Sequence, residues 1–172
     1  VIDCGIIPTP TAQFIIKEKK LSGGIVVTAS HNPIEWNGLK FLDSDGCFLN
    51  ADKMKELLSG TPKENTLNKA KVIESKNSYK DHIDNVLNLN CIDIKRIKSK
   101  KFKVVVDTVN GAAYKALPEI LEKLNCNVIK IYCNNDGTFP RGTEPIPSNL
   151  NDLSNAVIKN NADIGFATDP DA

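Results

Sequence analysis

The sequence predicts an α/β protein: a three-layer α/β/α domain with a mostly parallel mixed sheet, preceded by part of a second domain of the same type. Residues 102–167 run strand, helix, strand, loop, helix, strand, an order that requires parallel strands and crossover helices. Residues 1–60 hold a looser series of short strands and helices, and the stretch 61–77 is polar. We therefore expect two domains, residues 1–76 and residues 77–172.

The elements of the N-terminal part follow from short patterns. Residues 11–20 combine apolar side chains with a cationic end, which predicts a helix. Residues 25–28 form a β-branched run typical of a buried strand. Residues 39–42 alternate weakly before an Asp-Gly turn signal, and residues 52–58 predict another helix.

The C-terminal part has the clearer periodicity. A helix is expected over residues 79–87, before a basic stretch at 95–103. The apolar runs and stripes then predict strands at 102–107, 127–132 and 162–167, helices at 112–124 and 151–160, and a Gly- and Pro-rich loop at 134–149. In such a sheet the working loops lie beyond the carboxyl ends of the strands.

Net charge and the length of the apolar runs argue against several classes of function. Lys and Arg number 22 against 21 Asp and Glu, a net charge of +1. This balance gives the protein no general electrostatic attraction to nucleic acid or to an anionic membrane. The apolar runs are far shorter than the ~18 residues of a membrane span. The six cations of residues 95–103 are the one hint of nucleic acid, and we expect them to form a solvated surface with Phe102 in the core.

The cysteines and the chain ends indicate the setting of the protein. Five cysteines without a C-x-x-C pair predict reduced thiols and a cytoplasmic protein, and two histidines argue against a His-rich metal site. The chain opens on Val1 without a signal sequence and stops at Ala172 without a helix-ending signal. We expect it to be a piece of a longer protein.

A candidate site follows the strand predicted at residues 25–28. The run 28–33 (Thr-Ala-Ser-His-Asn-Pro) holds Ser30 on a turn whose amides could bind an anion. Ser30 and His31 suggest a nucleophile and a base, but adjacent side chains of an extended backbone point opposite ways, so we expect His31 to be badly placed to deprotonate Ser30. The G-x-S-x-G elbow of serine hydrolases is absent. The alternative is an ordinary turn with local hydrogen bonds.

A second candidate site follows the last predicted strand. Asp169 and Asp171 alternate in an extended loop, so both carboxylates could converge on one hard cation such as Mg²⁺. The alternative is a plain Asp-Pro turn.

These two loops carry a resemblance to a known family. The run 24–41 (GIVVTASHNPIEWNGLKF) resembles the active-serine signature of the α-D-phosphohexomutases, and residues 169–172 (DPDA) resemble the opening of that family's metal loop. Supporting likenesses lie in the same order along the chain, at residues 5–10, 106–112, 136–140 and 144–147. The resemblance is to the phosphoglucosamine mutase, phosphomannomutase and phosphoglucomutase members together, and it implies the end of their domain one and most of domain two.

The resemblance implies an intramolecular phosphotransferase of the isomerase class. Ser30 would carry a phosphoryl group and move it between O1 and O6 of a glucosamine, mannose or glucose phosphate, through a hexose bisphosphate. Mg²⁺ would bridge phosphorylated Ser30, Asp169 and Asp171. Lys40 matches a lysine expected to act as acid/base and phosphate contact, and His31 belongs to the same catalytic loop, where it is expected to shape the loop more than to transfer protons.

Several alternatives stay open at this point. The chain could be a non-catalytic domain of the same fold that binds a phosphosugar or a protein partner. Residues 1–172 alone are expected to be inactive, because the third metal Asp and the later sugar-binding domains are missing. Arg141 is expected to be a solvated loop cation, and Trp36 either lines the cleft or caps a local cluster. The sequence predicts neither the preferred sugar nor the oligomeric state.

Overall fold

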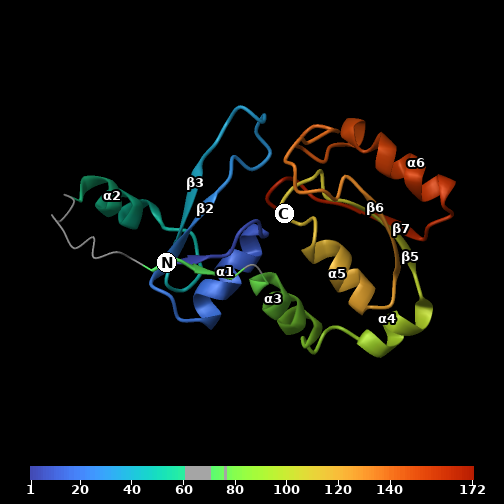
Figure 1. Cartoon of the computed structure of the whole chain (residues 1–172), viewed down its shortest axis with the longest axis horizontal. Coiled ribbons are helices and arrows are strands. Elements are labelled where there is room, and N and C mark those ends of the chain that lie inside the picture. The colour runs from blue at the N-terminus through green and yellow to red at the C-terminus, as the bar shows by residue number, and fades with distance from the viewer. Residues whose placement is uncertain (61–70, 76) are drawn as a thin grey trace.

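The computed structural model describes residues 1–60, 71–75 and 77–172, and it divides visibly into an N-terminal and a C-terminal part (Figure 1). Residue 76, near which the sequence predicts a domain boundary, lies outside the described residues. The N-terminal part comprises β1 (Ile2–Asp3), α1 (Thr9–Glu18), β2 (Gly23–Val27), β3 (Leu39–Asp43), α2 (Ala51–Ser59) and β4 (Ile73–Glu74). The C-terminal part comprises α3 (Ser78–Leu87), α4 (Ile94–Lys100), β5 (Lys103–Asp107), α5 (Ala116–Lys123), β6 (Asn127–Ile131), the 3₁₀ turn η1 (Pro147–Asn149), α6 (Asn151–Lys159) and β7 (Ile164–Ala167).

The C-terminal part is built on a parallel three-stranded sheet in the order β6-β5-β7. Its central strand contributes three consecutive valines, Val104–Val106, all at most 2% exposed. Val104 and Val106 pack on α5 through Leu121, and α6 covers the other face (Figure 1). Gly165 of β7 allows this close approach, because a Cβ there would lie 2.9 Å from Val157 Cγ2. The predicted three-layer α/β/α architecture is confirmed.

The N-terminal part holds two separate strand pairs. Strands β2 and β3 pair antiparallel, and β1 pairs with β4 in parallel, Ile2 opposite Ile73. Helix α1 packs on β2 at Gly24, where a Cβ would lie 2.7 Å from Ile16 Cδ1. Strands β1 and β4 were not predicted, because a two-residue strand is too short to show a hydrophobic period.

Helix α3 links the two parts. On one side its His82 stacks on Phe14 of α1 with ring centroids 4.9 Å apart, and His82 Nδ1 lies 3.0 Å from Thr11 Oγ1. On the other side Tyr79 donates its hydroxyl to Glu119 of α5 over 2.9 Å. Burial lowers the pKa of His82, since the charged imidazolium loses hydration there. These contacts fix α1, and the residues at its N-terminus, against the C-terminal part.

Two sequence expectations differ from the structure in detail. The predicted helix 112–124 begins only at Ala116, because Val109 and Asn110 adopt left-handed φ values of 49° and 56° and the Ala112 amide donates to Pro170. Phe102 was expected in the core and is 37% exposed, since it precedes the strand at the edge of the α4 turn. In the described residues, no helix has the length and apolar content that a membrane crossing needs.

Candidate active site

The serine loop, residues 28–33, begins where β2 ends. Ser30 has φ 53°, in the left-handed region, and its amide donates to Thr28 Oγ1 over 2.9 Å. The Asn32 amide and side chain both donate to the Ala29 carbonyl, over 3.1 and 2.8 Å. The loop is therefore shaped by hydrogen bonds among its own residues, the local pattern that Ser, Thr and Asn favour in turns.

The left-handed serine changes the relation between Ser30 and His31. The sequence predicts that these side chains point apart, and that prediction is wrong: Ser30 Oγ and His31 Nδ1 lie 3.5 Å apart. The premise of an extended backbone fails at Ser30, so the alternation of side chains fails with it. His31 is therefore within reach of the serine hydroxyl, at the long end of hydrogen-bond distance.

The aspartate loop, residues 168–172, follows β7. Its backbone is held by hydrogen bonds from distant segments: the Thr168 amide donates to Asp107 over 3.0 Å, the Ala112 amide to Pro170 over 2.7 Å, and the Thr9 amide to Asp171 over 2.9 Å. Gly111 permits the approach, because a Cβ there would lie 2.5 Å from the Pro170 carbonyl oxygen.

The two loops meet through side chains. Ser30 Oγ donates to Asp169 Oδ2 over 3.4 Å, although 139 positions separate them. Asp171 Oδ2 accepts from Lys40 Nζ over 2.5 Å and from Thr9 Oγ1 over 2.9 Å. The C-terminus accordingly lies between the two parts in Figure 1. All five residues predicted for the site are thus brought together: Ser30, His31, Lys40, Asp169 and Asp171.

The two aspartates differ in their electrostatics. Burial, and then the neighbouring Asp171 charge, raise the pKa of Asp169 above its ordinary value. Burial also acts to raise the pKa of Asp171, but hydrogen bonds from Lys40 and Thr9 outweigh it, so this pKa is lowered. Asp169 thus carries a negative charge that the surrounding protein compensates poorly.

Mg²⁺ fits this donor set as a partial ligand shell. Two carboxylates and a hydroxyl are hard oxygen ligands, and Mg²⁺ commonly takes one or two carboxylates together with phosphate and water. In the part of the chain that the structure describes, no group of three or more His, Cys, Asp and Glu side chains is placed to hold a metal. In the residue before Asp169, the buried Thr168 Oγ1 has no hydrogen-bond partner, and such an oxygen suits a water molecule.

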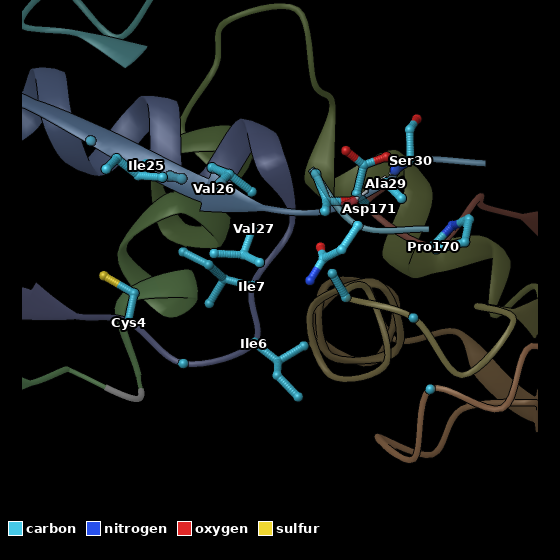
Figure 2. Close-up of a pocket in the computed structure, with 18 of the residues that line it drawn as sticks. Cys4, Ile6, Ile7, Ile25, Val26, Val27, Ala29, Ser30, Pro170 and Asp171 are labelled. Atoms are coloured by element: carbon cyan, nitrogen blue, oxygen red, sulfur yellow. Dashed lines mark hydrogen bonds between the residues drawn. The ribbon is translucent and has the colours of Figure 1, made fainter. Parts of the chain in front are cut away.

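A cleft of about 880 Å³ opens beside the two loops. Ser30, Ala29, Pro170 and Asp171 gather at one end, and apolar side chains including Val27 line the other (Figure 2). Trp36 also lines the cleft, which decides between the two alternatives left open for it, and it is 65% exposed. The cleft therefore has a polar end at the two loops and an apolar end along β2.

Two features of the site were missed or misjudged. Arg141 was expected to be a solvated loop cation, and that expectation is wrong: Arg141 is buried and pairs with the buried Asp107 over 2.6 Å. Nothing in the local sequence signals a partner 34 residues away. Thr9 was also missed as a partner of Asp171, although it lies in the run 5–10, which resembles a family motif.

Comparisons with known proteins show the family of the chain. The model of phosphoglucomutase/phosphomannomutase alpha/beta/alpha domain II matches residues 77–172, and the model of domain I matches residues 1–68. The chain belongs to the phosphoglucomutase/phosphomannomutase family.

Members of this mutase family match along the whole chain. A probable phosphoglucosamine mutase of Methanopyrus kandleri is 34% identical, and a phosphoglucomutase/phosphomannomutase of Thermococcus kodakarensis is 37% identical, each over 100% of this chain and 38% of the relative. A putative phosphomannomutase structure from Thermus thermophilus superposes with a TM-score of 0.79 and 28% identity, covering 98% of this chain and 39% of that one. The chain spans about 38% of the length of its curated relatives.

Proposed function

We propose that the protein is a phosphohexomutase that moves a phosphoryl group between O1 and O6 of a hexose, through phosphorylated Ser30 and a hexose bisphosphate. One observation carries the proposal: the Ser30 hydroxyl and the Asp169 carboxylate lie 3.4 Å apart at one end of a cleft. The substrate class is a hexose monophosphate, in line with the names of the relatives, with glucosamine, mannose and glucose phosphates as candidates.

The residues of the chain supply the positioning that phosphoryl transfer needs. A sugar hydroxyl attacks the phosphorus on Ser30, the new O–P bond forms, and the bond to Ser30 Oγ breaks. The reverse transfer from the other phosphate of the bisphosphate restores the phosphoserine. Negative charge is redistributed over the phosphoryl, attacking and leaving oxygens during such a transfer. Groups that are already fixed in place stabilise that charge best. Lys40, held beside Asp171, is assigned to contact the phosphoryl oxygens, to take the proton of the attacking hydroxyl and to pass it to the leaving Ser30 oxygen.

His31 and the metal ligands complete the assignment. His31 Nδ1, 3.5 Å from Ser30 Oγ, holds the serine side chain toward the cleft. Asp169, Asp171 and the Ser30 oxygen would hold Mg²⁺, which neutralises negative charge on the phosphoryl group when bound. The raised pKa of Asp169 supports this ligand set, since a cation would relieve the repulsion between the two carboxylates.

The organisation of the protein is part of the proposal. Residues 1–76 and 77–172 are assigned to two successive domains, with the site between them. The relatives are much longer than this chain, so sugar-binding residues are expected outside it, and residues 1–172 alone are expected to show no mutase turnover even with Mg²⁺ and a bisphosphate. Five free cysteines support a reducing compartment, the cytoplasm.

The experiment follows Ser30 in the full-length protein. Incubation with a hexose 1,6-bisphosphate and Mg²⁺ is expected to add one phosphate, mapped to Ser30 by peptide mass spectrometry. Ser30→Ala is expected to abolish both the modification and turnover on a panel of glucosamine, mannose and glucose phosphates. Ser44→Ala, an exposed serine on the turn after β3, is the matched control and keeps both.

Two results would contradict the proposal. Near-normal turnover by a folded Ser30→Ala protein would remove the serine from the mechanism. Binding of hexose phosphates by the full-length protein without turnover of any of them would favour the non-catalytic phosphosugar-binding alternative.

A further inference from the structure

Arg141 lies in the loop between β6 and η1, and the proposed phosphoryl transfer gives it no function. Its side chain is 2% exposed, and its Nε donates to the fully buried Asp107 over 2.6 Å. Taking both charges out of water is costly, and replacing such a pair by apolar side chains often leaves stability unchanged. The Arg141–Asp107 pair therefore contributes a fixed placement of the groups that the guanidinium binds, more than stability.

The guanidinium binds the peptide that leads into the aspartate loop. Arg141 Nη2 donates to the Thr168 carbonyl over 2.6 Å, and the Thr168 amide donates to the Asp107 carbonyl over 3.0 Å. Thr168 is held on both sides, and the next residue is Asp169. A planar fork can bind Asp107 and Thr168 in fixed relative positions, which a single lysine ammonium cannot reproduce.

The same segment reaches the serine loop two residues later. Thr143 Oγ1 donates to the carbonyl of His31, the residue after Ser30. Arg141 and Thr143 therefore bind the chain next to Asp169 and next to Ser30, whose side chains face each other at 3.4 Å.

We propose that Arg141 and Thr143 form a brace that sets the separation of Ser30 and Asp169, with Arg141 as a positioning residue for phosphoryl transfer. The effect on rate rests on the proposed function, while the geometric effect does not. In reactions limited by alignment, a displacement of about 1 Å costs about 100-fold in rate. The brace acts through the two loops and touches no substrate.

The test uses the full-length protein and three single variants. Arg141→Lys keeps the charge and loses the fork. Thr143→Val removes the donor to His31 and keeps the side-chain volume. Arg96→Lys, on the exposed surface of α4, is the matched control, because Arg96 is the other arginine of the chain. The readouts are hydrogen exchange of the peptides 168–172, 28–33 and 103–107, and the rate of Ser30 phosphorylation by a hexose 1,6-bisphosphate.

The brace predicts a different pattern for each variant. Arg141→Lys raises exchange at 168–172 about tenfold, as expected for one lost charged hydrogen bond, and leaves 103–107 unchanged. Phosphorylation of Ser30 slows about 100-fold, with the bisphosphate KM unchanged. Thr143→Val raises exchange at 28–33 instead and slows phosphorylation about tenfold, while Arg96→Lys changes neither readout.

A double variant guards against loss of the fold. Arg141→Met with Asp107→Asn removes both buried charges at similar side-chain size, keeps an acceptor for the Val109 amide and has no donor for the Thr168 carbonyl. Selective exchange at 168–172 with slow phosphorylation supports the brace. Unchanged exchange and rate in this variant or in Arg141→Lys overturns it, as does exchange that rises equally at 103–107, which marks a general stabiliser. If the unmutated protein is never phosphorylated at Ser30, the proposed function fails, and the exchange comparison still decides the brace.

Discussion

The serine loop and the aspartate loop are held in place in opposite ways. Hydrogen bonds within residues 28–33 shape the turn around Ser30. The loop 168–172 instead depends on partners from α1, from the end of β5 and from Arg141. The turn around Ser30 is thus formed by local sequence, whereas the carboxylates are positioned by the tertiary fold. Changes that break the aspartate loop should therefore act from far away, whereas changes to the turn around Ser30, apart from the contact of Thr143 with the His31 carbonyl, should act from close by.

The largest expected effect is a loss of activity when either carboxylate of the aspartate loop is replaced, with opposite changes in thermal stability. Asp169→Asn and Asp171→Asn in the full-length protein should each lower kcat about 100-fold or more and weaken its Mg²⁺ dependence, as removal of a preorganised electrostatic group does. Their thermal stabilities with metal chelated should move in opposite directions. Asp169→Asn relieves repulsion between two neighbouring carboxylates, whereas Asp171→Asn removes the partner of Lys40 and Thr9.

Melting curves in the presence of a chelator, with steady-state kinetics over a range of Mg²⁺ concentrations, check this pair. Asp84→Asn, an exposed partner of Lys123, is the control and should leave kcat unchanged. Wild-type rate and Mg²⁺ response in both variants would show that the aspartate loop is a plain turn.

A smaller but still large effect should come from outside the loop. Gly111→Ala places a Cβ 2.5 Å from the Pro170 carbonyl oxygen, so the backbone at one of the two residues must shift. The free energy of unfolding should fall by about 1–3 kcal/mol, the usual cost of overpacking. Phosphorylation of Ser30 should slow as Asp169 shifts.

Gly60→Ala is the matched glycine control. Its φ of −64° suits alanine, and the added Cβ would lie 3.4 Å from the Glu56 carbonyl oxygen, so stability should be unchanged or slightly higher. Denaturant unfolding of the two variants measures the difference. Equal stabilities would show that the approach of Gly111 to Pro170 is not close in solution.

A modest effect is expected inside the serine loop. Thr28→Val removes the acceptor of the Ser30 amide at nearly constant volume, and a hydrogen bond of this kind contributes about 1 kcal/mol, or about fivefold in rate. Ser30 phosphorylation should slow by about that factor, with exchange raised at 28–33 and unchanged at 168–172. Thr28→Ser retains the hydroxyl and should behave as wild type. A Thr28→Val protein that loosens 168–172 instead would contradict the local character of this loop.

The smallest effect is a pH dependence at the α1–α3 contact. The pKa of His82 is lowered from 6.5 in the folded protein, so the unfolded chain binds the proton more tightly. Stability should fall as the pH drops through 6.5 and level off below the folded-state pKa of His82. His82→Gln should flatten this part of the profile. Thermal melts from about pH 5 to about pH 8, the range in which histidine titrates, measure the dependence. If the dependence of stability on pH is the same in His82→Gln as in the unmutated protein, it belongs to another titrating group.

The contrast between the loops also explains what the sequence could predict. The α/β/α layers, the parallel strands and the serine turn depend on local patterns such as Val104–Val106 and the run 28–33, and these were predicted correctly. Likewise, Asp169 and Asp171 could be placed beyond a strand end. The partners Arg141 and Thr9 were not predicted, because long-range hydrogen bonds leave no periodic trace. The His31 contact was misjudged because one left-handed residue reverses the direction of a side chain.

The strand order β6-β5-β7 has a consequence of its own. From β5 the chain crosses to β6 on one side, and the next crossover passes over to β7 on the other, with α5 and α6 on opposite faces (Figure 1). The loops that leave β5 and β6 lead to helices on opposite faces and therefore diverge, and residues of both loops line the cleft at the carboxyl end of the central strand. Topology thus decides where a ligand can enter, independently of side chains. The residues at that cleft could be exchanged for those of another chemistry while its location stayed the same.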